Sequence, residues 1–88
     1  MKRPNLAGDI IRSRRLGDGK WIVMAVLTHK LICRKWTDGC IGWSNSAEKW
    51  LYLKDNQSIK PLQSLNLSGG HINDLIPYMM ANPTRRDA

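Results

Sequence analysis

The 88-residue sequence has no phenylalanine, only two cysteines and no long apolar run. No stretch approaches the roughly 20 consecutive apolar residues that a membrane-spanning helix needs, so we expect no membrane partner. The sequence also has no C-x-x-C pair and no glycine-rich phosphate loop that leads into a helix. A chain of this length supports one small domain, which excludes an enzyme with separate cofactor and substrate domains.

Acidic residues are scarce as well. Seven Asp and Glu stand against 14 Lys and Arg, which gives a formal net charge of +7. Residues 1–35 hold nine Lys and Arg against two Asp, whereas residues 36–88 hold five of each sign. This clustering predicts a polyanionic or acidic partner. The alternative is a solvated surface that only keeps the protein soluble.

The order of segments predicts four regions. Residues 1–7 form a basic N-terminal segment, residues 8–62 a barrel, residues 63–81 a linker and short helix, and residues 82–88 a polar tail. The N-terminal segment is not typical of a signal peptide, because Asp9 and Arg12 follow without a sustained apolar region. We therefore expect a soluble, cytoplasmic protein.

Short runs rich in β-forming residues dominate the barrel region. They occupy residues 9–15, 21–27, 31–36, 49–53 and 58–62. Gly17-Asp18-Gly19 and Asp38-Gly39 are typical of tight turns between strands. In the first run, Arg12 and Arg14 are expected on one side of a strand. Five short strands with such turns predict a mainly β protein, a small antiparallel barrel.

Apolar residues recur at helical spacing near the C-terminus. The stripe consists of Ile72, Leu75, Ile76, Met79 and Met80. Proline is tolerated in the first turn of a helix, so Pro77 allows a short α-helix over residues 74–81. We expect its apolar face to cap an open end of the barrel. A homodimer contact through this helix is the alternative.

Some motifs in the barrel region are shared with a known family. Gly8-Asp9-Ile10-Ile11-Arg12 matches a G-D-x-V-x strand, and Ile59-Lys60-Pro61-Leu62 matches a final L-x-P-L. A hairpin edge of the type C-x-W-x-D-G is resembled by Cys33, Trp36, Asp38 and Gly39, with one extra residue between Cys33 and Trp36. Over residues 8–62 the chain thus resembles the YodC-like family of short bacterial proteins. The resemblance implies an SH3-like barrel and no established activity.

Basic residues of the predicted strands form the candidate binding surface. They are Arg12, Arg14, Arg15, Lys20, Arg34 and Lys35. Trp43, between Gly42 and Ser44 in an irregular segment, is the candidate stacking contact on unpaired bases. The other tryptophans, Trp21, Trp36 and Trp50, are expected in the core, because without phenylalanine other large side chains must fill the barrel.

Three other kinds of site have weaker support. An aromatic cage of Trp43, Trp50 and Tyr52 for methylated Lys or Arg is disfavoured by the positive charge of the domain. The potential zinc ligands have unsuitable spacing, so we expect no metal; they are His29, Cys33, Cys40 and His71. A Cys33–Cys40 disulfide across a hairpin is disfavoured in an intracellular chain.

No catalytic constellation is present, so we expect neither an enzyme nor a cofactor. The leading hypothesis is a small basic module that contacts nucleic acid through a basic strand face. The alternative is a protein-interaction module or inhibitor, encoded by a phage or other mobile element, that binds an acidic protein. A third hypothesis is an oligomeric enzyme with a pocket shared between subunits.

Overall fold

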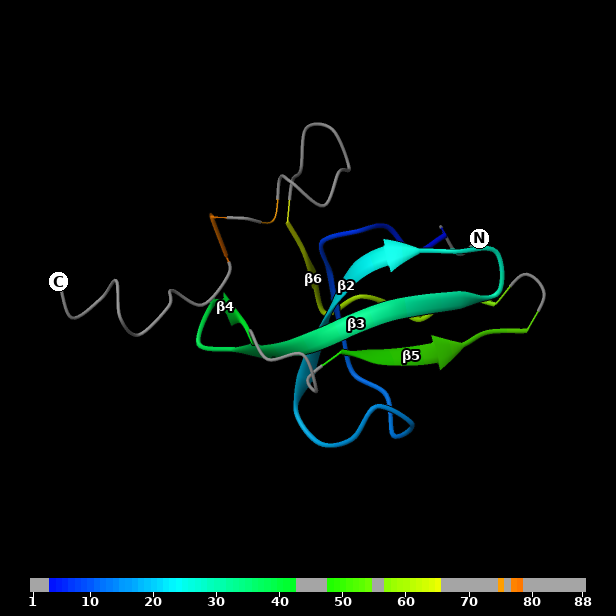
Figure 1. Ribbon diagram of the computed structural model, residues 1–88, viewed down its shortest axis with the longest axis horizontal. Coiled ribbons are helices and arrows are strands. Elements are labelled where there is room, and N and C mark those ends of the chain that lie inside the picture. The colour runs from blue at the N-terminus through cyan, green and yellow to red at the C-terminus, as the bar shows by residue number, and fades with distance from the viewer. Residues whose placement is uncertain (1–3, 43–47, 55–56, 66–74, 76, 79–88) are drawn as a thin grey trace, which may run out of the picture.

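The computed structural model describes residues 4–42, 48–54, 57–65, 75, 77 and 78. Within these residues the protein consists of β-strands joined by turns (Figure 1). The strands are β1 (Asp9–Ile11), β2 (Lys20–Val26), β3 (Lys30–Thr37), β4 (Cys40–Ile41), β5 (Lys49–Tyr52) and β6 (Gln63–Ser64). No helix in this part of the chain is long and apolar enough to cross a membrane.

The strands form one antiparallel sheet, which curls into a half-barrel. Its order is β4-β3-β2-β1-β6, and β5 pairs with β3 outside this path. Thr37 of β3 lies opposite Cys40 of β4, and Leu31 of β3 lies opposite Leu51 of β5. Because β2 occupies the other edge of β3, β4 and β5 share one edge at its two ends. The expectation of a mainly β, antiparallel fold is therefore confirmed.

Both faces of the sheet carry a hydrophobic core. Ile11 points to the first core and its neighbour Ile10 to the second, as the alternation of a strand requires. The first core also contains Leu16, Trp21, Val23, Leu31, Cys33 and Leu51, with Leu53 and Ile59 packed against it. The second contains Ile22, Met24, Trp36, Ile41 and Leu75, with Leu65 and Tyr78 packed against it.

Two predicted turns have the backbone that their residues favour. In the β3–β4 hairpin, Asp38 has a φ of 52° and Gly39 a φ of 78°. Two positive φ values in a row match the twist of the flanking strands. The β1–β2 connection has positive φ at Gly17 (111°) and Gly19 (86°). Both turn predictions are confirmed.

The first strand is shorter than predicted, because the chain turns at Ser13. β1 ends at Ile11 rather than at Arg15. The carbonyl oxygen of Ser13 accepts hydrogen bonds from the N–H groups of Leu16 (3.0 Å) and Gly17 (3.2 Å). This turn buries Leu16 in the first core. Arg14 therefore lies on a turn, and the prediction that it shares a strand with Arg12 is wrong.

The last predicted strand, residues 58–62, is also wrong. Pairing with β1 starts at Leu62, whose N–H donates to the Ile10 carbonyl oxygen at 2.7 Å, and continues through β6. Proline has no N–H, so Pro61 cannot donate a hydrogen bond to a ladder. The backbone of Ile59 instead pairs with the side chain of Asn5. The Asn5 amide donates to the Ile59 carbonyl oxygen at 2.7 Å and accepts from the Ile59 N–H at 2.9 Å.

The N-terminal segment joins the fold through buried polar groups. Asn5 and Asp9 are 5% and 1% exposed. The Asp9 carboxylate accepts hydrogen bonds from the Leu6 N–H at 3.0 Å and from Ser64 Oγ at 2.7 Å. These contacts tie the start of the chain to β6. Asn5, in the segment that was distinguished from the barrel only by its sequence position and charge, is thus part of the packed structure.

The C-terminal helix predicted over residues 74–81 is not shown. Of this stretch, only Leu75, Pro77 and Tyr78 are among the described residues. Leu75 is fully buried in the second core, and the Tyr78 ring lies 6.1 Å from the Trp36 ring. At these two residues the C-terminal segment packs on its own sheet. The other members of the predicted stripe lie outside the described residues: Ile72, Ile76, Met79 and Met80.

Candidate nucleic-acid interface

The candidate interface is centred on the end of the sheet where β1 leads into β2. Arg12 follows the last residue of β1, and Lys20 is the first residue of β2. Because Ile11 lies opposite Trp21, the next position of the ladder places Arg12 opposite Lys20. Lys20 lies opposite Trp36 of β3 in turn. Opposite residues share a face, so the register brings both cations to the same side as the Trp36 indole.

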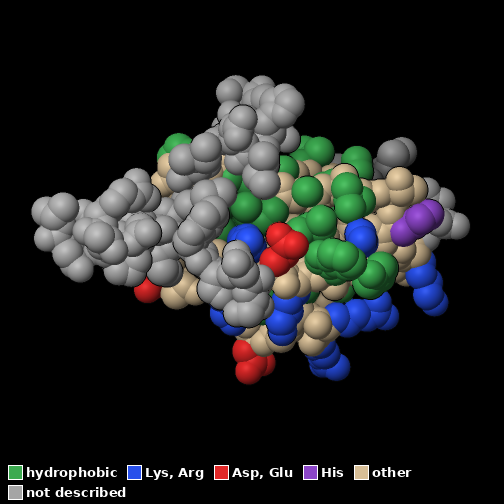
Figure 2. Space-filling model, in the orientation of Figure 1, with side chains coloured by type: hydrophobic (Ala, Val, Ile, Leu, Met, Phe, Trp, Pro, Cys, Tyr) green, Lys and Arg blue, Asp and Glu red, His purple; other side chains and the backbone are tan. Residues whose placement is uncertain are grey.

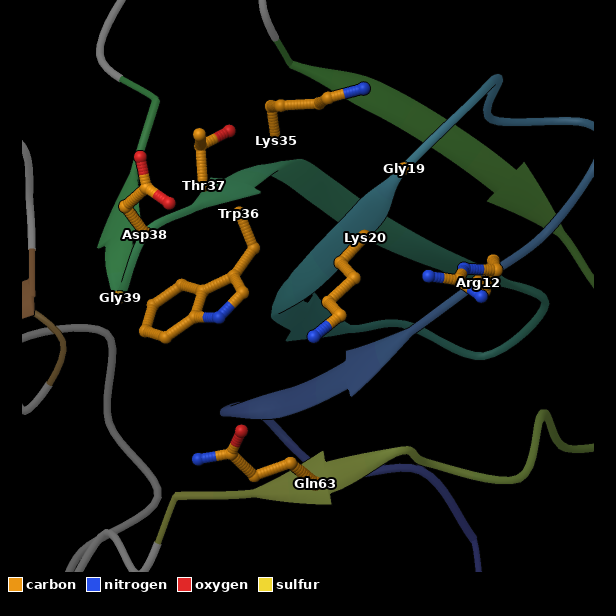
Figure 3. Close-up of a pocket in the computed structure, with 9 residues that line it drawn as sticks. All are labelled: Arg12, Gly19, Lys20, Lys35, Trp36, Thr37, Asp38, Gly39 and Gln63. Atoms are coloured by element: carbon orange, nitrogen blue, oxygen red, sulfur yellow. The ribbon is translucent and has the colours of Figure 1, made fainter.

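These side chains line an open pocket of about 610 Å³. Its lining consists of Arg12, Gly19, Lys20, Lys35, Trp36, Thr37, Asp38, Gly39 and Gln63. In Figure 3 the Trp36 ring and the Lys20 side chain face the middle of the pocket, Arg12 lies beside Lys20, and Gln63 comes from β6. The Lys35 side chain extends away from the others. Asp38 is the one acidic residue in this lining.

Three of the predicted site residues have exposed charges without a protein partner in the described part of the chain. Arg12, Arg14 and Lys20 are exposed, and their side chains make no hydrogen bond or ion pair with another described residue. Cations held close together without compensating carboxylates raise the local positive potential. This end of the sheet is therefore suited to attract an anion.

Other cations of the predicted site bind backbone carbonyl groups. Lys35 Nζ donates to the carbonyl oxygen of Asp18, and Arg15 Nη1 donates to that of Tyr52 at 3.4 Å. Lys49, which was not predicted as a site residue, donates to Leu16 O at 3.1 Å. These three contacts hold the β1–β2 turn against β3 and β5. Lys35 and Arg15 thus have a structural role in addition to their charge.

Arg34 is separated from Lys35 by the alternation of β3. Its side chain is 14% exposed, lies 3.6 Å from the Glu48 carboxylate and donates to Gly42 O at 3.5 Å. Neighbouring residues of a strand point to opposite faces. The predicted cations therefore do not form one strand face: Arg12 and Lys20 lie together, Lys35 binds the turn, and Arg34 is paired with an acid.

A second exposed group lies on β5. Trp50 and Tyr52 are 51% and 58% exposed, and their ring centres lie 6.5 Å apart. We call these two residues the aromatic patch. The Lys30 ammonium lies 3.6 Å from the Trp50 ring centre and 5.7 Å from that of Tyr52. Figure 2 shows apolar side chains exposed on this face of the molecule, with basic side chains around them.

The prediction that Trp50 lies in the core is wrong, whereas those for Trp21 and Trp36 are confirmed at 5% and 9% exposure. Trp50 is exposed because the core side of β5 is taken by the leucines: Leu51 is 2% exposed and Leu53 packs on the first core. The alternation of Trp50 and Tyr52 with two leucines was the signal that could have shown this. Trp43, the predicted stacking residue, lies outside the described residues.

The candidate metal ligands do not come together in the described part of the chain. No group of three His, Cys, Asp or Glu side chains there could hold a metal ion, and His71 lies outside it. Cys33 and Cys40 are free thiols. Cys33 is buried, and this burial raises the pKa of its thiol to about 12. Such a thiol is not a ready nucleophile or metal ligand, because the thiolate is the reactive form.

Comparisons with protein-family models, with curated proteins and with solved structures find no match for this chain. The resemblance to the YodC-like family over residues 8–62 therefore stays a prediction.

Proposed function

We propose that this protein is a small SH3-like barrel that binds nucleic acid through the cations at the β1–β2 end of its sheet. One observation carries the proposal: Arg12 and Lys20 line the same pocket, and neither of their charged groups has a partner among the described residues. Arg14 adds a third exposed charge on the adjoining turn. The proposed function is binding, without catalysis and without a cofactor.

Phosphate is the ligand group that best fits this arrangement. Arg and Lys are the usual phosphate-binding side chains, and each contact releases a counterion from the nucleic acid. The Gln63 amide, on the pocket wall, offers neutral hydrogen-bonding groups of the kind that contact phosphate and sugar oxygens. Two-fifths of the chain hold the whole charge excess, so the contacts are expected on one side of the molecule.

The test is a salt titration of oligonucleotide binding, followed by fluorescence anisotropy. Between about 50 and 200 mM salt, the affinity of the wild-type protein is expected to fall steeply. The double variant Arg12→Gln/Lys20→Gln should bind more weakly. Because two phosphate contacts are lost, the slope of log affinity against log salt should be shallower by about 1.5.

A matched control carries the same change in net charge. Lys54 and Lys60 are exposed, and their side-chain ammonium groups, like the charged groups of Arg12 and Lys20, have no partner among the described residues. Lys54→Gln/Lys60→Gln should retain the wild-type slope. Equal losses in the two double variants, or an affinity that salt does not change, would contradict the proposal.

An acidic protein as partner remains the second hypothesis, because it would use the same exposed cations. The two hypotheses differ in their response to nuclease. A partner that is captured from lysate by the wild-type protein, survives nuclease treatment and is lost with Arg12→Gln/Lys20→Gln would favour the protein partner. Loss of the captured material on nuclease treatment would favour nucleic acid.

A further inference from the structure

We propose that the aromatic patch stacks against unpaired bases, so that the ligand of the proposed function is a single-stranded nucleic acid. This inference rests on that function, since it assigns the class of nucleic acid that the basic surface binds. Its first support is the exposure of the patch: Trp50 is 51% and Tyr52 58% exposed. Two neighbouring aromatic rings in water leave apolar surface that a stacked base would cover.

The rings are oriented so that each offers its own face. The planes of Trp50 and Tyr52 are inclined by 70°, and the ring centres are 6.5 Å apart. The Trp50 Nε1–H donates to Glu48 Oε1 at 3.4 Å. This bond is at the edge of the indole, so it orients the ring without covering its face.

Cations flank both rings, and this favours an anionic ligand. The Lys30 ammonium lies 3.6 Å from the centre of the Trp50 ring, and Arg15 donates to the Tyr52 carbonyl oxygen at 3.4 Å. Glu48, which accepts the hydrogen bond from Trp50, lies 3.6 Å from Arg34. A methylated-lysine peptide would meet Lys30 at the rings and be repelled. A nucleic acid offers a base to Trp50 and a phosphate to Lys30, whose flexible side chain can leave the ring.

The patch and the basic pocket lie on the same face of the sheet. Trp50 is opposite Ile32 of β3, and Lys20 is opposite Trp36. Residues 32 and 36 have the same parity on one continuous strand, so their side chains point the same way. Leu75 and Tyr78 pack on the part of this face that holds the second core. The aromatic patch lies outside that core and is exposed.

An unpaired strand is the form of nucleic acid that can use these rings. In a duplex, both faces of a base are stacked on its neighbours, whereas a single strand can present each base to an aromatic side chain. Small barrels that bind single strands combine such rings with a positively charged groove and contact about 4 nucleotides or more.

The test compares single-stranded and duplex oligonucleotides of about 12 nucleotides. The wild-type protein is expected to prefer the single strand. Trp50→Ala/Tyr52→Ala should lower single-strand affinity by at least about fivefold for each ring and leave duplex affinity unchanged. Trp50→Phe, which keeps an aromatic face, should retain most of the binding. Leu27→Ala/Leu62→Ala is the matched control, because these side chains are also exposed, at 45% and 54%.

The outcomes separate this inference from the proposed function. If wild-type protein binds neither form, the proposed function itself is overturned. If it binds duplex and single strand equally, and Trp50→Ala/Tyr52→Ala changes neither affinity, only the stacking role is overturned. Saturable binding of a trimethyllysine peptide that requires Trp50, with no effect of Trp50→Ala on oligonucleotides, would assign the patch to a cationic ligand and overturn the inference.

Discussion

At the scale of single residues, three tryptophans on neighbouring strands have three different environments. Trp21 lies in the first core, Trp36 in the second, and Trp50 is exposed. The Trp21 Nε1–H is buried without a hydrogen-bond partner among the described residues, while the ammonium groups of Lys35 and Lys49 lie 5.0 and 5.3 Å from its ring centre. Cation–π attraction at such distances adds to the burial of the ring. Trp21 therefore stabilises the β1–β2 turn together with the two lysines.

The buried thiol leads to a prediction about cysteine reactivity. Cys33 is fully buried with a pKa raised to about 12, whereas Cys40 is only half-buried. In the native protein at about pH 8, Cys40 should be alkylated well before Cys33, because only a negligible fraction of Cys33 is thiolate. Mass spectrometry of peptides after timed iodoacetamide treatment measures this difference. It should disappear in denaturant, and equal native rates would contradict it.

The same thiol has a defined effect on stability at high pH. Its folded-state pKa of about 12 lies above the ordinary value of 9.0, so the neutral form is favoured in the fold. Its contribution to stability is complete below pH 9.0 and is lost as the pH rises towards 12. The free energy of unfolding should therefore fall less steeply above pH 9 in Cys33→Ala than in the wild-type protein.

At the scale of elements, short turns and shared edges build the sheet. β4 and β5 pair with the two ends of the same edge of β3, and the Gly42 N–H extends β4 by donating to Lys35 O at 2.8 Å. β1 has only three residues, yet it pairs with β2 on one side and β6 on the other. The short strands β1, β4 and β5 thus each pair with one of the two long strands, β2 or β3.

The backbone of the β3–β4 turn allows the destabilisation by a glycine-to-alanine substitution to be predicted. A Cβ added at Gly39 would have no atom within 4 Å, so Gly39→Ala adds only the strain of its positive φ of 78°. The expected loss is about 1–2 kcal/mol in the free energy of unfolding, measured by urea denaturation. Gly19→Ala should cost somewhat more: its Cβ would lie 2.7 Å from Lys35 Nζ, and although the flexible lysine can move away, it would then lose its hydrogen bond to the Asp18 carbonyl oxygen. A larger loss at Gly39 than at Gly19 would contradict this reasoning.

The packing of the C-terminal segment predicts a strong effect at one leucine. Leu75 is fully buried in the second core, so Leu75→Ala should lower the free energy of unfolding by about 2–5 kcal/mol. Leu62→Ala makes the same chemical change at a side chain that is 54% exposed, and should stay within about 0.5 kcal/mol of wild type. Chemical denaturation of the full chain compares the two. Similar losses would show that Leu75 is not a core residue in solution.

At the scale of the whole molecule, apolar and basic residues occupy different places. The buried apolar residues lie on both faces of one curled sheet, so the same strands contribute to two hydrophobic cores. Arg12, Arg14 and Lys20, whose charges have no partner among the described residues, lie where the sheet ends. Binding there would not require the core to open.

Ligand binding by the folded protein should raise its thermal stability. At about 100 times the dissociation constant, a ligand that binds only the folded state adds about 2.7 kcal/mol, which raises the Tm of a small domain by about 10 °C or more. We expect such a shift with a single-stranded oligonucleotide at low salt, measured by calorimetry. At about 1 M salt the shift should vanish, because phosphate contacts are screened. A shift of undiminished size there would show that phosphate contacts do not carry the binding.

Local patterns in the chain were sufficient for the longer strands and for two of the turns. Short runs of β-forming residues predict β2, β3 and β5, and Asp38-Gly39 predicts its hairpin, because strand propensity and positive φ depend on a residue and its close neighbours. The uneven charge is likewise a property of the sequence alone. These features are short-range, so no tertiary contact is needed to recognise them.

The grouping of side chains depended on the tertiary structure. The strand register places Arg12 beside Lys20 and directs Arg34 and Lys35 to opposite faces of the sheet. Trp50 is exposed on the face of β5 that does not pack on the first core. Packing ended β1 at Ile11 and paired β6 with it. These outcomes depend on which strands meet and on what covers each face. The net charge that first indicated a polyanionic partner thus becomes a small set of exposed cations with a defined position.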